Sequence, residues 1–186
     1  MKRAVSLLFL LSLLVLFACC SASASPADTF LTAAGEWKID AMTEMMTPET
    51  AASLGERLTE NKEELDPSEQ EVLRRLYSHL SYTVESQTQA SDGRWTFTIE
   101  VTIPDMQKIL EYADAEILVS GETAGELITR MLDEGTIAQD FMTEETIDVL
   151  FEQRDGEWKI PYSETENTAL VRLLSLDETL RFFVLN

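Results

Sequence analysis

The chain has 186 residues, and its 34 aspartate and glutamate residues outnumber its 14 lysine and arginine residues, giving a net charge of -20 at pH 7. This acidic surplus excludes a nucleic-acid-binding protein, whose electrostatic footprint is basic. The length suits one domain rather than two once a targeting segment at its start is set aside.

The first 18 residues have the pattern of an export signal. Lys2 and Arg3 form a short basic head, an apolar stretch runs from Ala4 to Phe17, and the small residue Ala18 ends the segment. This order and length are typical of a signal peptide that is removed on export. Without Lys2 and Arg3 the remaining chain has 12 basic against 34 acidic residues, a net charge of -22.

The end of this segment, Leu16-Phe17-Ala18-Cys19, resembles the lipobox of bacterial lipoproteins. In that family a diacylglyceryl group is attached to the cysteine and the chain is cut just before it, so the resemblance implies a lipid on Cys19. Phe17 departs from the smaller residue usual in the family, and Cys20 offers a second register. The resemblance implies an extracytoplasmic protein anchored by lipid to the cell membrane. The alternative is a cleaved secretory signal whose cysteines are incidental.

Both cysteines of the chain, Cys19 and Cys20, lie at this junction, so no thiol remains for a disulfide inside the domain. Residues 19–25 continue as a short Ser/Ala tether, in which Ser21 to Ser25 span about 20 Å at most when extended. We therefore expect a single domain, residues 26–186, held close to the bilayer.

Signals that begin a helix follow the tether. Ser25-Pro26-Ala27-Asp28 combines an N-cap serine, a proline at the first helical position and a nearby acid. Thr47-Pro48-Glu49 restarts a helix, and Asp66-Pro67-Ser68-Glu69 begins another with a capping box. Helical spacing of apolar residues after Ser25 predicts one continuous amphipathic helix through Phe30, Ala34, Trp37, Ala41 and Met45.

The apolar period then changes to two residues. Leu80, Tyr82 and Val84 alternate with polar residues, as do the apolar residues from Trp95 to Ile103. This pattern predicts two strands joined by a turn at Asp92-Gly93. A second hairpin is predicted from Ile147, Val149 and Phe151, the turn Asp155-Gly156 and the returning segment Trp158-Lys159-Ile160.

Between the hairpins the sequence returns to a helical period. Pro104-Asp105 ends the strand and precedes two helices, whose apolar faces are Met106, Ile109, Leu110 and Ala113 in the first and Leu127, Ile128, Met131 and Leu132 in the second. The tail is predicted to be helical from Asn167 to Leu174, with further turns between Leu176 and Phe183. Helices that interrupt an antiparallel sheet indicate the α+β class.

The order of these elements resembles the nuclear transport factor 2-like cone fold, and more narrowly bacterial lipoproteins that carry it. The likeness rests on residues 30–35 (FLTAAG) and 39–42 (IDAM) in the leading helices, Ile103-Pro104-Asp105, and residues 155–160 (DGEWKI). It implies a curved antiparallel sheet packed against N-terminal helices, with a helical insertion between hairpins. The segment from Glu116 to Asp140 and the tail after Ser163 depart from the pattern. The family includes both enzymes and binding modules, so the fold gives no activity.

The residues of the domain supply little catalytic chemistry. His79 is the only histidine, and no cysteine remains to complete a zinc site or a Cys-His pair. No Gly-Lys pair supports a phosphate-binding loop. We therefore expect no catalytic residue, no metal and no cofactor.

Aromatic residues give the best candidate for a ligand pocket. Tyr82, Trp95, Phe97 and Trp158 are expected on or near one sheet face, where Met106 joins them beneath the helices. The alternative is that these side chains fill the core, because aromatic residues at strand spacing normally face the interior.

Three functions follow as hypotheses. The first is a non-catalytic binding or protein-interaction module of the cell envelope, with an unknown small ligand or envelope protein as partner. The second is an isomerase- or dehydratase-like enzyme that uses the cone cavity, and the third is an acidic scaffold for a cationic partner. An open apolar cavity would favour the first two, whereas a sheet face filled by side chains would favour the scaffold.

Overall fold

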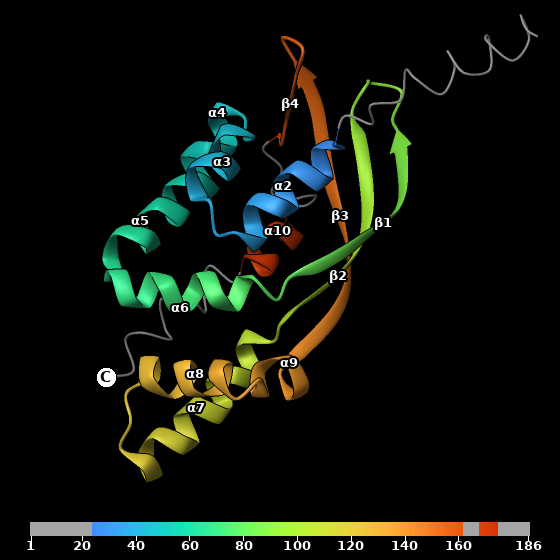
Figure 1. The fold of residues 1–186 in the computed structure, drawn as a ribbon. Coiled ribbons are helices and arrows are strands. Elements are labelled where there is room, and N and C mark those ends of the chain that lie inside the picture. Colours follow the sequence, from blue (N-terminus) through green and yellow to red (C-terminus); the bar gives the residue numbers. More distant parts are fainter. Residues whose placement is uncertain (1–23, 162–167, 175–186) are drawn as a thin grey trace, which may run out of the picture.

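The computed structural model describes residues 24–161 and 168–174 (Figure 1). The predicted signal peptide, the predicted lipid-attachment residue Cys19, its neighbour Cys20 and the turns predicted between Leu176 and Phe183 lie outside the described residues. Within the described part, the helices are too short or too polar to cross a membrane.

The first helix, α2 (Pro26–Gly35), begins at the predicted cap. Ser25 Oγ accepts a hydrogen bond from the Asp28 amide at 3.0 Å, and the Asp28 carboxylate accepts one from the Ser25 amide at 3.1 Å. These two bonds form a capping box, which satisfies amides that the first helical turn leaves unpaired.

The prediction of one continuous helix through Met45 is wrong. The chain turns after Gly35 and restarts as α3 (Ile39–Glu44). Trp37 has a positive φ of 53°, and the Lys38 amide donates to the Ala33 carbonyl at 2.9 Å. This is the hydrogen-bond pattern of a Schellman helix end, here without the glycine that usually occupies the left-handed position.

Four short helical segments complete the N-terminal half: α4 (Pro48–Thr50), the π-helical turn η1 (Ala51–Gly55), α5 (Glu56–Glu64) and α6 (Pro67–Tyr77). The predicted capping box at Asp66 begins α6. At the other end of α6, the Tyr77 hydroxyl donates to the Leu174 carbonyl and so joins this helix to the end of the described chain.

The sheet contains β1 (Ser81–Gln89), β2 (Trp95–Pro104), β3 (Met142–Arg154) and β4 (Glu157–Lys159), ordered β1-β2-β3-β4 with antiparallel neighbours. Both predicted turns are confirmed, since Gly93 has a φ of 88° and Asp155 and Gly156 have φ values of 53° and 85°. The register of β1 shifts between Val84 and Ser86, which marks a bulge in this outermost strand.

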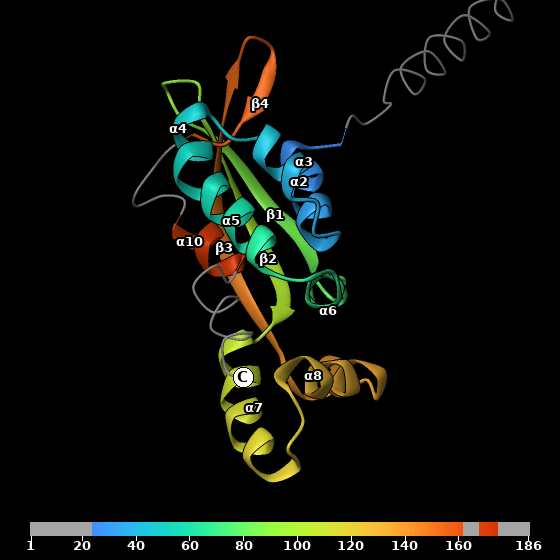
Figure 2. The ribbon, with the colours of Figure 1, turned by 90° about the vertical axis from the view of Figure 1, so that its left-hand side faces the viewer.

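The helices α2 to α6 lie on one side of the sheet, as two perpendicular views show (Figures 1 and 2). Alternate residues of β2 and β3 point toward these helices, and Ile99, Val149 and Phe151 are buried there. Residues of the opposite face, such as Glu100 and Thr146, are exposed. The core therefore lies between the sheet and the helices, and the other sheet face contacts solvent.

The predicted helical insertion between the hairpins consists of α7 (Met106–Ser120), α8 (Ala124–Asp133) and α9 (Thr136–Asp140). The apolar faces predicted for its first two helices are the buried ones. The insertion lies below the sheet in Figure 1, and α8 contacts α6. A last described helix, α10 (Thr168–Leu173), contacts β3. The α+β class, with an open four-stranded antiparallel sheet, is therefore confirmed.

Candidate functional site

The five residues predicted to line one pocket do not lie together around an open cavity. Phe97 is 2% exposed and packs edge-on against Phe151, with ring centroids 5.3 Å apart. Met106 is 5% exposed and borders a space of only about 10 Å³ near the end of α6. These two side chains belong to the core, which was the alternative interpretation of the pattern.

The other three predicted residues lie nearer the surface. Trp95 and Trp158 form an edge-to-face pair with ring centroids 6.3 Å apart. Trp158 also borders a shallow pocket of about 480 Å³, which the start of α2, the end of α3 and β4 surround. The Tyr82 hydroxyl lies 3.4 Å from both Thr32 Oγ1 and the Asp28 carbonyl, so it joins β1 to α2.

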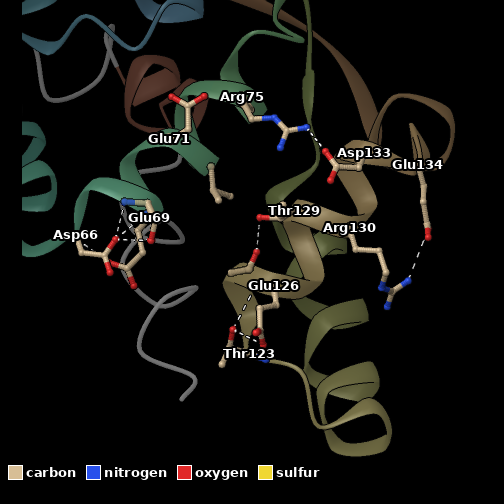
Figure 3. Close-up of a pocket in the computed structure, with 13 residues that line it drawn as sticks. Asp66, Glu69, Glu71, Arg75, Thr123, Glu126, Thr129, Arg130, Asp133 and Glu134 are labelled. Carbon is tan, nitrogen blue, oxygen red and sulfur yellow. Dashed lines mark hydrogen bonds and ion pairs between the residues drawn. The ribbon is translucent and has the colours of Figure 1, made fainter.

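A larger groove lies elsewhere, between α6 and α8, and has a volume of about 790 Å³ (Figure 3). The two helices run in the same direction, because Asp66 and Thr123 at their starts both line the groove and Arg75 contacts Asp133 near their ends. Arg75 Nη2 lies 2.7 Å from Asp133 Oδ1. This ion pair joins the two helices across one end of the groove.

The N-terminal end of the groove is formed by two capping boxes. Asp66 Oδ1 accepts hydrogen bonds from the Ser68 amide at 2.7 Å and the Glu69 amide at 3.0 Å, and the Asp66 amide donates to the Glu69 carboxylate at 2.8 Å. Thr123 and Glu126 form the same arrangement on α8, where the Thr123 amide donates to Glu126 at 2.9 Å. Helix N-termini ordinarily attract anions. Here the chain's own carboxylates already accept from these amides.

Carboxylates outnumber cations along the groove. Arg75 and Arg130 are the arginines that line it, and six acidic residues line it with them: Asp66, Glu69, Glu71, Glu126, Asp133 and Glu134. The lining thus carries a formal charge of -4. A groove with this surplus favours a cationic ligand over an anionic one.

Acidic partners hold both arginines in place. Arg130 makes a two-point contact with Glu122, with N···O distances of 3.1 and 2.9 Å, and lies 3.7 Å from Glu134. The hydrogen bonds from Arg130 lower the pKa of Glu122, and the same contacts raise the pKa of Arg130. Near the groove mouth, hydrogen bonds from the Ser68 hydroxyl and from backbone amides lower the pKa of Asp66.

The groove also has a less polar floor. Val72 is 7% exposed and lines it together with Gly125 and Thr129. The Thr129 hydroxyl donates to the Gly125 carbonyl at 2.7 Å, so it is directed back toward its own helix. An acidic rim around such a floor suits a side chain with an apolar stem and a positive end, such as lysine or arginine.

Sequence reasoning identified only part of this site. Asp66 and Glu69 were recognised as a helix cap, whereas Thr123, Glu126 and Arg130 were not singled out. The spacing Thr123-x-x-Glu126 is itself a readable capping signal. The side-by-side packing of α6 and α8 joins segments separated by more than 40 residues, and no local pattern reports that contact.

Among the described residues, no group of three or more His, Cys, Asp or Glu side chains is placed to hold a metal ion. His79 follows α6 and is not among the residues that line the groove. Comparison with protein-family models, curated proteins and solved structures found no match to this chain. The site is therefore interpreted from its own geometry.

Proposed function

We propose that the chain is a bacterial lipoprotein, anchored outside the cytoplasm through Cys19, whose acidic groove binds a basic segment of an envelope protein. The observation that carries the binding part is the groove between α6 and α8, where six carboxylates and two arginines line about 790 Å³. Support for the anchor comes from the sequence Leu16-Phe17-Ala18-Cys19.

The filled sheet face favours this scaffold-like function over a ligand pocket or an enzyme cavity beneath the helices. Phe97, Ile99 and Phe151 occupy that face and are at most 2% exposed. An enzyme of the isomerase or dehydratase kind needs room for its substrate beside an acid or base, and these buried side chains take up that position.

A basic peptide suits the groove in both charge and shape. Its ammonium or guanidinium groups would lie along the rim formed by Glu71, Glu126 and Glu134, and its methylene groups would contact Val72. Attraction between a groove lining of formal charge -4 and a basic segment accelerates encounter and weakens as salt is added.

We also propose that the fold is a variant of the nuclear transport factor 2-like cone. Its support is the order of the elements, with leading helices on one face of an antiparallel sheet. The segment from Glu116 to Asp140, which departs from the cone pattern, contributes α8 to the groove. In this proposal the binding site is therefore an addition to the fold rather than the cone cavity.

The anchor is tested by membrane fractionation of the full chain. Cys19→Ala removes the thiol that would carry the lipid, so the variant is expected in the soluble fraction or retained with an uncleaved signal. Cys20→Ala is the matched control and should stay with the membrane as a processed protein. Processed Cys19→Ala protein in the membrane, or loss of anchoring only in Cys20→Ala, would contradict attachment at Cys19.

The groove is tested with a ten-residue lysine peptide and the variant Glu71→Gln/Glu134→Gln, which removes two negative charges from the rim. We expect about tenfold weaker binding, equivalent to about 1.4 kcal/mol. The control Glu100→Gln/Glu144→Gln removes the same charge from exposed positions on the solvent-facing side of the sheet. Equal weakening in both variants would show that net charge alone attracts the peptide, and the groove assignment would fail.

A further inference from the structure

We propose that the end of the domain that carries Trp95 and Trp158 rests on the bilayer surface, so that these two indoles lie in the lipid headgroup region. This inference depends on the proposed lipid anchor and adds an orientation to it. The occupant of this surface is the membrane that holds the lipid, rather than a soluble ligand or a second copy of the chain.

The first support is position. The β1–β2 and β3–β4 turns and the start of α2 lie toward the upper end of both views, whereas α7 and α8 lie at the lower end (Figures 1 and 2). Ala24, the first described residue, lines the same shallow pocket as Trp158 and Gly156. The chain therefore enters the domain beside one of the two tryptophans.

The second support is tether length. Five residues separate Cys19 from Ala24, counting Ala24 itself, and fully extended they span only about 17 Å. A lipid on Cys19 would hold Ala24 within that distance of the headgroups. The face that surrounds Ala24 is then the part of the domain closest to the membrane.

The third support is the charge of the two turns. In residues 90–94 the charges of Asp92 and Arg94 cancel, and Arg94 Nε lies 2.7 Å from Asp92 Oδ2. In residues 154–159, two basic residues offset Asp155 and Glu157, and Lys159 lies 2.8 Å from Glu157. Both turns are formally neutral in a chain with a net charge of -20.

This neutrality matters because bacterial and other cell membranes carry anionic lipids, whose repulsion of acidic groups decays over a Debye length of about 8 Å. Two formally neutral turns reduce that repulsion at the closest approach. The acidic groove between α6 and α8 belongs to the lower end of the views, so this orientation directs it away from the bilayer.

The fourth support is the chemistry of the tryptophans. Trp95 and Trp158 are only partly buried and stand next to the two turns, at the start of β2 and within β4. Indole rings combine an apolar body with a polar N–H, and they are enriched at the membrane-water interface for that reason. The third tryptophan, Trp37, is 8% exposed and stacks on Tyr77, with ring centroids 4.5 Å apart. Because it is buried, Trp37 serves as an internal reference for the two tryptophans of the proposed contact end.

The experiment uses the mature protein, purified from bacterial membranes, in phosphatidylcholine vesicles with and without bromine atoms on the lipid chains near the headgroups. Bromine quenches indole fluorescence at short range. The Trp37→Phe variant, which retains Trp95 and Trp158, is expected to lose emission about twofold in brominated vesicles. The Trp95→Phe/Trp158→Phe variant, which retains only Trp37, should change little.

A flotation assay on the same samples separates the two proposals. Protein that does not float with the vesicles refutes the lipid anchor. Protein that floats while Trp37→Phe emission is unchanged by bromine refutes the orientation and leaves the anchor intact. Circular dichroism of each variant establishes that it is folded. Equal quenching in both variants would also refute the orientation, since Trp37 is remote from the proposed contact end.

Discussion

Replacement of Phe97 by alanine tests whether the helix-facing side of the sheet is the core of the domain. The ring is 2% exposed and packs edge-on against Phe151 at 5.3 Å. Truncating a buried phenylalanine to alanine costs about 3 to 5 kcal/mol, because apolar contacts are lost and a cavity remains. A domain has only about 5 to 15 kcal/mol of stability in total, so about a fifth or more of it should disappear.

The assay is urea unfolding followed by circular dichroism on wild type and variant. Phe151→Ala and the double variant complete a mutant cycle, in which the edge-to-face contact should give a coupling energy of about 0.5 to 1.5 kcal/mol. Thr98→Ala, on the opposite sheet face, serves as control. It loses only an exposed bond to Asp148 and should cost about 0.5 kcal/mol. If Phe97→Ala costs less than about 1 kcal/mol, the assignment of this face as core is wrong.

Two further predictions concern the ends of the groove helices. Thr123→Ala removes the side-chain cap of α8 and should lower the free energy of unfolding, measured with urea, by about 1 kcal/mol. Thr123→Ser keeps a capping hydroxyl and should retain the wild-type stability. Equal losses in both variants would contradict the capping role. The pKa of Asp66 is lowered mainly by the hydrogen bond from the Ser68 hydroxyl. The stability that the charged Asp66 carboxylate contributes is therefore complete above its ordinary pKa of 3.8, and it is lost as the pH falls through the lower pKa of the folded state. Stability measured between about pH 6 and pH 2 should therefore fall less in Asp66→Asn than in wild type, and identical pH profiles would refute this cause.

Local signals predicted much of the fold. The caps at Ser25 and Asp66, the alternation from Trp95 to Ile103 and the turns at Gly93 and Gly156 each depend on neighbouring residues, so the sequence displays them directly. The first predicted helix between the hairpins is present for the same reason, since its apolar residues from Met106 to Ala113 share one buried face over about two turns.

The break between α2 and α3 was missed because the apolar period does not change there. Ala34 and Met42 on either side of it are both buried, and the left-handed turn at Trp37 lacks the glycine that would have marked it. The turn is held by contacts with α6, where Trp37 stacks on Tyr77. Tertiary packing thus overrides a local pattern that would otherwise extend the helix.

The candidate site was harder to predict than the fold. The spacing of the aromatic residues predicted a pocket on the sheet, but the same spacing is equally compatible with a packed interior. Because Phe97 is buried, its position in this pattern belongs to the packed interior. The groove depends on two helices from distant segments and on the ion pair between Arg75 and Asp133. In a chain with 34 carboxylates, no spacing distinguishes those that meet across a groove from those on a solvated surface.

The bulge in β1 has a consequence for crowding. In the described part of the chain β1 has a strand neighbour on one side only, and exposed backbone along such an edge can recruit another polypeptide into a continuous ladder. Under the proposed lipid anchor, many copies confined to one leaflet would meet far more often than copies diluted in bulk solution. The irregular register at Glu85, together with the exposed hydrophilic side chains from Glu85 to Gln89, disfavours that templating and so protects densely packed molecules from aggregation.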